Sequence, residues 1–330
     1  DSQNYKQLQE LYWKIEGVYH QQTYLVKAIM YQMRRVEQQR AILNSYRSEH
    51  QKSTRTLSDK TMSSFVWYQF LKVFLMKMNT TDDDDDHVEA RNDMITHCRW
   101  FYRDNKSILK QIDEFENVYK STDAIRWYSK QSFVYRLINV ALRTENMSVL
   151  YLFRYYLKDL CGQLTQNFRQ IELYVRDMSF ELYRGVRLNT NEVEKLKQSI
   201  GQMISANGFL SATWDRQIAE VYAGFAQQLT DKNLVSVIYK INVDLAQARS
   251  IIFADVAQYS EHLDEQEVLF DIGSIFTLNS IEFDDKNNCW LISLTTTDKM
   301  EEIVDKHVQS KLDSLRYVPT HIVFGEILLE

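Results

Sequence analysis

Residues 180–188 read Phe-Glu-Leu-Tyr-Arg-Gly-Val-Arg-Leu. Apolar side chains stand at alternate positions of this stretch, which is the period of a β-strand. Before it, apolar residues recur at helical intervals, and after it strand-like runs follow at 234–243, 268–283 and 289–297. A helical first part followed by a strand-rich second part predicts the α+β class.

The chain of 330 residues divides into four expected regions. Residues 1–60 should form a long amphipathic helix, to about residue 47, and a linker. Residues 61–170 should form a helical lead-in, 171–300 the core, and 301–330 a helical tail that stops within an apolar run, so we expect a truncated chain. The polar residues on the seam of the first helix leave a coiled coil and a docked helix both open; they are Gln22, Gln32 and Gln39.

Composition excludes several classes of function. A net charge of −6 disfavours nucleic acid as the main partner, and no apolar run is long enough to span a membrane. With 8 glycines and neither a GxGxxG nor a GxxxxGK[ST] motif, a glycine-loop nucleotide site is excluded. The three cysteines lack CxxC spacing, so we expect neither a disulfide framework nor a metal site. The run Asp82 to Asp86 is expected to be a solvated spacer.

Arg184 is the first candidate functional residue. Strand parity places it on the face of Leu182 and Val186, where an apolar side chain would be usual. A guanidinium in such a place needs a partner, and its shape suits two-point binding of a carboxylate or a phosphate. An internal Arg–Glu ion pair is the open alternative. The neighbouring Gly185 would let a ligand approach the backbone.

Two later strands carry further candidates. Ser211 and Thr213 share one face of their predicted strand and could orient a carboxylate or a sugar hydroxyl, although hydroxyl residues are also ordinary in strands. Glu265 and Glu267 are two residues apart, so on a strand they would share one face at roughly 7 Å. Carboxylates that close raise each other's pKa, which points to a cation or a reaction unless the strand end is simply solvated.

In order, Tyr-Arg184-Gly, Phe-Leu-Ser211-Ala-Thr213 and Glu265-Gln-Glu267 resemble the Arg, Ser-Thr-Ser and Glu-x-Glu elements of the arginine-specific mono-ADP-ribosyltransferases. The resemblance covers about residues 170–297, and 94–170 is similar to the helical lead-in of eukaryotic members. The end of the chain is similar to members that continue into tetratricopeptide repeats. The resemblance implies a mixed two-sheet core that binds NAD.

The resemblance also implies transfer of ADP-ribose from NAD to arginine side chains of an acceptor protein, with release of nicotinamide; whether NADP is accepted stays open. Arg184 would bind the diphosphate. Glu267 would hold the ribose 2′-hydroxyl and stabilise the ribosyl cation, with Ser211 orienting its carboxylate. Glu265 would accept a proton from the incoming guanidinium. The implied set of NAD contacts also includes Gly185, Thr213 and Tyr222.

Tyr222 has two interpretations. The resemblance implies an aromatic ring against nicotinamide, whereas helical packing of Val221, Tyr222 and Phe225 favours a core residue. Ser-Ala-Thr in place of Ser-Thr-Ser removes one hydroxyl, and we expect activity at a full or a reduced level.

Two other functions stay open. NAD hydrolysis would depend less on Glu265, because water replaces the guanidinium. A non-catalytic helical module would self-associate through residues 1–50. The sequence names neither the acceptor protein nor the cellular compartment.

Overall fold

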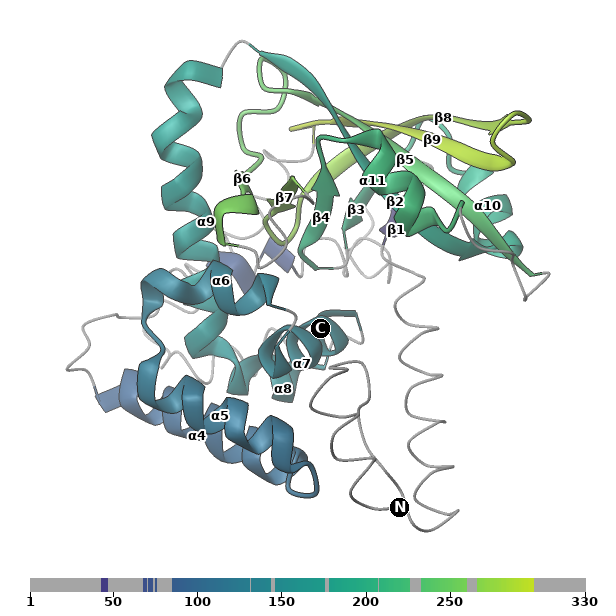
Figure 1. The fold of residues 1–330 in the computed structure, drawn as a ribbon. Helices are drawn as coiled ribbons and strands as arrows, with labels where there is room; N and C mark the ends of the chain where they lie inside the picture. Colours follow the sequence, from purple (N-terminus) through teal and green to yellow (C-terminus); the bar gives the residue numbers. More distant parts are fainter. Residues whose placement is uncertain are drawn as a thin grey trace, which may run out of the picture.

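A computed structural model describes a large part of the chain, and Figure 1 shows its fold. The described residues are 43–46, 68–69, 71–73, 75, 85–130, 132–143, 146–175, 178–206, 208–225, 233–259 and 266–299. The expected first helix lies outside them except at its end, where residues 43–46 form a strand and not a helix. The expected tail at 301–330 and the residue Glu265 also lie outside the described residues.

Helices make up the first described part of the molecule (Figure 1). In chain order they are α4 (Asp85–Phe101), α5 (Lys106–Val118), η2 (Ser121–Asp123), α6 (Ala124–Ser129), α7 (Phe133–Arg143), α8 (Met147–Leu152) and α9 (Arg154–Val175). The expected spacer at Asp82–Asp86 is wrong at its end, because α4 already begins at Asp85. No helix among the described residues has both the length and the apolar character needed to cross a membrane.

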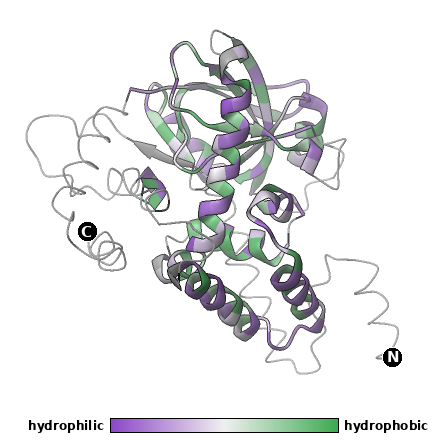
Figure 2. Cartoon of the chain, turned by 90° about the vertical axis from the view of Figure 1, so that its left-hand side faces the viewer, coloured by the Kyte–Doolittle hydropathy of each residue, from purple (hydrophilic) through white to green (hydrophobic). Residues whose placement is uncertain are grey.

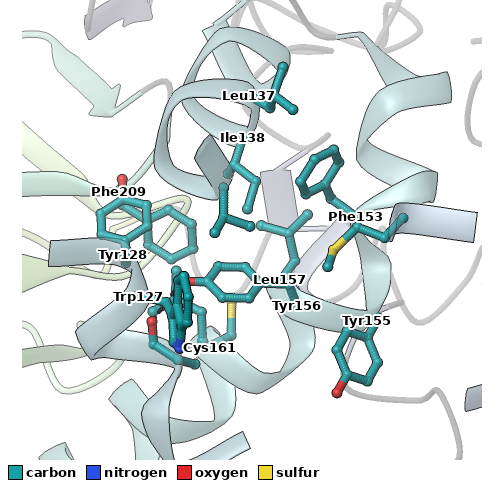
Figure 3. Packing of buried hydrophobic residues seen from close by; sticks show 14 of the residues in the cluster. Trp127, Tyr128, Leu137, Ile138, Phe153, Tyr155, Tyr156, Leu157, Cys161 and Phe209 are labelled. Atoms are coloured by element: carbon teal, nitrogen blue, oxygen red, sulfur yellow. Dashed lines mark hydrogen bonds between the residues drawn. The ribbon is translucent and has the colours of Figure 1, made fainter. Parts of the chain in front are cut away.

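The helices enclose an aromatic core. Tyr128 on α6 and Tyr156 on α9 are buried side chains of this cluster, and Phe209 joins it from the sheet (Figure 3). The ring centroids of Tyr128 and Phe209 are 5.2 Å apart. Figure 2 shows hydrophilic and hydrophobic residues interspersed along the helices, as expected for helices with one buried and one solvated side. The cluster therefore joins the helices to the edge of the site described below.

The second part is a mixed sheet. Its strands are β2 (Ser179–Asn189), β3 (Met203–Ala206), β4 (Leu210–Thr213), β5 (Leu234–Asp244), β6 (Phe253–Asp255), β7 (Glu267–Phe270), β8 (Ile275–Asp284) and β9 (Cys289–Thr296), with β1 (Leu43–Tyr46) at one edge. The order is β1-β3-β8-β9-β5-β2-β4-β7-β6, and β5 and β9 are parallel while the other neighbours are antiparallel. The strand-like runs at 234–243 and 289–297 and the α+β class are confirmed, whereas the run 268–283 divides into β7 and β8 with a turn between them.

The expected division into two sheets is not what the hydrogen bonds show. They join all the described strands into one sheet. However, β2 and β4 are joined by one residue pair, Tyr183 with Thr213, whereas β2 and β5 pair along eleven residues. The sheet thus consists of a long part that ends at β2 and a short part, β4, β7 and β6, which meet at a narrow junction.

The helices hold the short part of the sheet from one side. Helix α9 packs on β6 through Phe168 and Phe253, whose ring centroids are 5.2 Å apart. At the far end of β7, Lys72 forms an ion pair with the buried Asp271, with 2.7 Å between Nζ and Oδ2, and Gln69 donates to the carbonyl of Gly273 at 2.8 Å. Helical residues thus contact the short part at both ends.

Candidate active site

One short polar contact of the candidate site joins β4 to β7. These strands are antiparallel, with Thr213 opposite Glu267 and Ser211 opposite Leu269, so Ser211 and Glu267 share a face as diagonal neighbours. The Ser211 hydroxyl donates to Glu267 Oε1 at 2.6 Å. A hydroxyl–carboxylate bond of that length is typical of charge-assisted hydrogen bonds, so it fixes the orientation of the carboxylate.

Arg184 reaches the same point from β2. Its side chain crosses the junction between the two parts of the sheet, and Nη1 donates to the backbone carbonyl of Ser211 at 2.5 Å. Ser211 therefore accepts a hydrogen bond from Arg184 on its carbonyl and donates one from its hydroxyl to Glu267. Three candidates that are far apart in the sequence are brought together in the structure, on three different strands.

The neighbour of Arg184 on β5 is a buried tyrosine. Tyr239 stands opposite Arg184 in the register and is 6% exposed. Burial raises the pKa of Tyr239, and the positive charge of Arg184 offsets part of that rise. The phenol therefore remains neutral at physiological pH. Tyr239 is thus an uncharged aromatic neighbour of Arg184.

Thr213 serves the turn that follows β4. Its hydroxyl accepts a hydrogen bond from the backbone N–H of Asp215 at 3.1 Å. Asp215 in turn caps helix α11 (Arg216–Ala223) by accepting from the N–H of Gln217. This hydrogen bond explains a threonine at this position without any contact to NAD.

Gly185 has a packing role in the structure, and its expected contact with NAD stays a prediction. It lies on the opposite face of β2 from Arg184, beneath α11. A Cβ at this position would stand 1.6 Å from the carbonyl oxygen of Ala219 and 2.8 Å from the N of Ala223. The helix backbone occupies the space that we expected a ligand to use. Glycine is required here by close helix–sheet packing.

Strand β7 begins at Glu267, which changes the geometry expected for the Glu-x-Glu element. Gln266 has a φ of 45°, in the left-handed region that non-glycine residues rarely adopt. Its carbonyl accepts the N–H of Trp214 at 3.3 Å. Strand parity therefore does not extend across Gln266, and the argument that Glu265 and Glu267 share one strand face at roughly 7 Å does not apply.

Tyr222 is not a core residue. On α11 its side chain is 52% exposed and that of Val221 is 68% exposed. The buried side of this helix is formed by the small residues Ala219 and Ala223. The interpretation based on helical packing is thus wrong for these two side chains, and a contact of Tyr222 with nicotinamide stays a prediction.

Trp214 is a neighbour of the site that the sequence interpretation missed. It follows the Ser-Ala-Thr stretch directly, its ring lies 4.9 Å from that of Phe180, and its N–H binds the carbonyl of Gln266. It ties the end of β4 to the residue before Glu267. The signal that could have found it is its place beside a motif residue, together with a large aromatic ring at a strand end.

Two other features do not add to the site. Among the described residues, no group of three or more His, Cys, Asp or Glu side chains is placed to hold a metal ion. A hollow of about 500 Å³ runs along α9, but none of the candidate residues line it; its lining is Gly162, Thr165, Gln166, Arg169 and Gln170.

No protein-family model and no curated protein matches the sequence. Among solved structures, the chain is similar to the ADP-ribosyltransferase Vis from Vibrio splendidus in complex with the M6 inhibitor, with 17% identity, a TM-score of 0.41, and coverage of 68% of this chain and 90% of that one. It is also similar to the C3 exoenzyme of Clostridium limosum, with 16% identity, a TM-score of 0.40, and coverage of 62% and 94%.

A third similar structure is Plx2a, an ADP-ribosyltransferase toxin from Paenibacillus larvae, with 13% identity, a TM-score of 0.40, and coverage of 62% of this chain and 96% of that one. Similarity at this level assigns neither a family nor an activity. The function proposed below therefore depends on the residues of the site.

Proposed function

We propose that this protein is an NAD-dependent mono-ADP-ribosyltransferase that modifies arginine side chains of proteins. The observation that carries the proposal is the connection from Arg184 through Ser211 to Glu267, with hydrogen bonds of 2.5 and 2.6 Å. It joins a cation suited to a diphosphate with an oriented carboxylate, and the three residues are those of the ordered Arg, Ser and Glu elements in the sequence.

Arg184 fits a diphosphate group. A guanidinium carries five N–H donors in a planar fork, which matches phosphate oxygens in pairs. The bond to the Ser211 carbonyl fixes the position of this fork relative to Glu267. NAD would supply the ribosyl bond to nicotinamide, and Arg184 would hold the diphosphate so that the ribose faces the carboxylate.

Glu267 fits the charge that develops when that bond breaks. The bonding electron pair leaves with nicotinamide, so positive charge grows on the ribose, and a fixed carboxylate nearby stabilises it. Ser211 keeps the carboxylate in place at no further cost during the reaction. An acceptor guanidinium must lose a proton when its nitrogen forms the new bond, and Glu265 is the proposed base.

The test is to incubate the protein with labelled NAD and a mixed protein acceptor and to measure nicotinamide release and protein labelling. Glu267→Gln keeps the size of the side chain and removes its charge, so we expect release to fall by about 10²–10³-fold. Glu282→Gln is the control, because Glu282 is an exposed glutamate of the same sheet. Absence of nicotinamide release by the unmodified protein with NAD or NADP would overturn the proposal.

NAD hydrolysis is the second candidate. The contacts of the described residues, Arg184 with Ser211 and Ser211 with Glu267, would serve a water acceptor as well as an arginine. Glu265→Gln distinguishes the two: loss of protein labelling with retained nicotinamide release indicates a transferase, whereas release without labelling by the unmodified protein indicates a hydrolase.

A further inference from the structure

The main chain of Glu267 is held independently of its side chain. On the side away from β4, the N–H of Val256 donates to the carbonyl of Glu267 at 2.8 Å. Val256 is the residue after β6 and is 1% exposed. The carboxylate is thus oriented by Ser211 and the backbone by Val256, so the position of Glu267 depends on the segment that follows β6.

That segment is fastened to the helices at Tyr259. It forms one turn of 3₁₀-helix, η3 (Ala257–Tyr259), with the N–H of Tyr259 donating to the carbonyl of Val256 at 2.9 Å. The phenol oxygen of Tyr259 accepts from Nδ2 of Asn167 on α9 at 3.1 Å. The hydroxyl of Ser129 on α6 lies 3.2 Å from the carbonyl of the same residue and shares its proton between this oxygen and the carbonyl of Arg126 at 3.1 Å.

The ring of Tyr259 is also partly buried against the helical core. Its contacts therefore come from two helices that are separated in the sequence, α6 and α9. Both contacts are made by side chains of these helices and not by backbone hydrogen bonds of a helix or a sheet. The bond from Asn167 holds the ring of Tyr259, and the shared hydroxyl of Ser129 adds a weaker contact to its main chain. They restrict the rotation of the turn that carries Val256 and, through it, Glu267.

We propose that Tyr259 is a positioning residue for Glu267 and that the helical region acts on the reaction through it. The path runs from Asn167 to the Tyr259 hydroxyl, along η3 to Val256, and from the Val256 N–H to Glu267. Tyr259 does not itself act on the substrate. In its effect on catalysis this inference rests on the proposed function, while its structural part does not.

The kinetic test uses Tyr259→Phe and Asn167→Ala, which remove the two sides of one hydrogen bond and keep the ring. We expect each to lower kcat for nicotinamide release by about threefold to tenfold with an unchanged KM for NAD, because a displaced Glu267 weakens stabilisation of the transition state only. The double variant should lose no more than either single variant, since both remove the same bond.

The matched control is Tyr119→Phe. Tyr119 donates its hydroxyl to Asp159 at 2.8 Å, but both residues lie within the helical region and neither contacts η3 in the hydrogen bonds above. It should lower the melting temperature at least as much as Tyr259→Phe does, because its hydroxyl binds a carboxylate, and it should leave kcat unchanged. Equal changes in kcat for the two variants would overturn the proposal, because they would show a general loss of stability.

A second measurement does not need activity. Hydrogen–deuterium exchange should become faster in peptides that cover 253–259 and 266–270 in Tyr259→Phe, and should not change there in Tyr119→Phe. Unchanged exchange in both peptides would overturn the proposal even if kcat falls. If the unmodified protein releases no nicotinamide but exchange responds as expected, the proposed function fails and the coupling of Tyr259 to Glu267 stands.

Discussion

The polar side chains of the helical region, 85–175, and of the sheet region, 178–299, have different partners. Around Phe115, which is fully buried, the helical region gathers rings of Tyr119, Trp127, Phe133 and Tyr156 at centroid distances from 4.2 to 6.1 Å. The tyrosine hydroxyls bind nearby carbonyl or carboxylate oxygens, for example Tyr156 to the carbonyl of Ala124. These hydrogen bonds satisfy polar groups inside a packed core.

The sheet region places a guanidinium, a hydroxyl and a carboxylate at the junction of its two parts, where regular pairing stops. The three side chains are partly buried, and a polar group loses solvation there that an apolar residue would not, which favours the proposed function over a role in stability. The comparison separates the groups that carry the proposed chemistry, which lie in the sheet region, from the aromatic cluster of the helical region. Substitutions can separate the two.

The largest effect on stability should come from Phe115→Ala. Removing a fully buried ring from an aromatic cluster costs about 3–5 kcal/mol of the free energy of unfolding. Thermal or denaturant unfolding measures this loss. Val118→Ala, on the same helix but 53% exposed, should stay within about 0.5 kcal/mol. The comparison breaks if Phe115→Ala, at a temperature where it remains folded, also changes kcat.

Lys72→Met should come next, at about 3 kcal/mol, because it leaves the Asp271 carboxylate buried without its cation. Lys240→Met is the control; Lys240 pairs with Glu181 on the surface, so its loss should cost about 0.2–1 kcal/mol. Equal losses for both variants would show that the junction between helices and sheet does not depend on this buried pair.

The same ion pair predicts a dependence on pH. Burial lowers the pKa of Lys72, but the charge and hydrogen bond of Asp271 raise it further, and the net pKa lies above its ordinary value of 10.5. Since the folded pKa is the higher one, the stabilisation is complete below 10.5 and is lost as the pH rises through the folded pKa. Between pH 7 and 10 the difference in unfolding free energy between Lys72→Met and the unmodified protein should stay constant.

Of the variants proposed here, controls aside, Ser211→Ala should change the free energy of unfolding least. It should also give the clearest effect on kcat. Loss of its bond to Glu267 should lower kcat about tenfold to a hundredfold, while stability changes by less than about 1 kcal/mol. Ser205→Ala is a matched control, because that buried hydroxyl on β3 has no hydrogen-bond partner among the described residues. A full kcat for Ser211→Ala would show that Glu267 needs no orientation.

Strand parity predicted the faces of Arg184, Ser211 and Thr213 because their strands are regular over the residues concerned. The same argument failed one residue before Glu267, because the positive φ of Gln266 breaks the alternation of side chains. A glutamine gives no sequence signal for such a φ. The hydrogen bond from Ser211 to Glu267 depends on the pairing of β4 with β7. The alternation of side chains within one strand cannot predict which strands pair.

The close packing at Gly185 and the exposure of Tyr222 have one cause. Both depend on which side of α11 faces β2, and that side consists of Ala219 and Ala223. Counting large apolar residues favoured the side of Val221 and Tyr222 instead. Small residues allow a helix to approach a strand closely, and a glycine beneath them completes the contact, so the helix covers Gly185 and exposes its bulky side chains.

The single pair between Tyr183 and Thr213 has a mechanical consequence. Arg184 belongs to the long part of the sheet, whereas Ser211 and Glu267 belong to the short part. A small rotation about this pair would change the separation between Arg184, the proposed diphosphate anchor, and the Glu267 carboxylate while every ladder on either side stayed intact. Under the proposed function, the separation of these two groups depends on this hinge-like contact and on the hydrogen bond from Arg184 to Ser211 that crosses it.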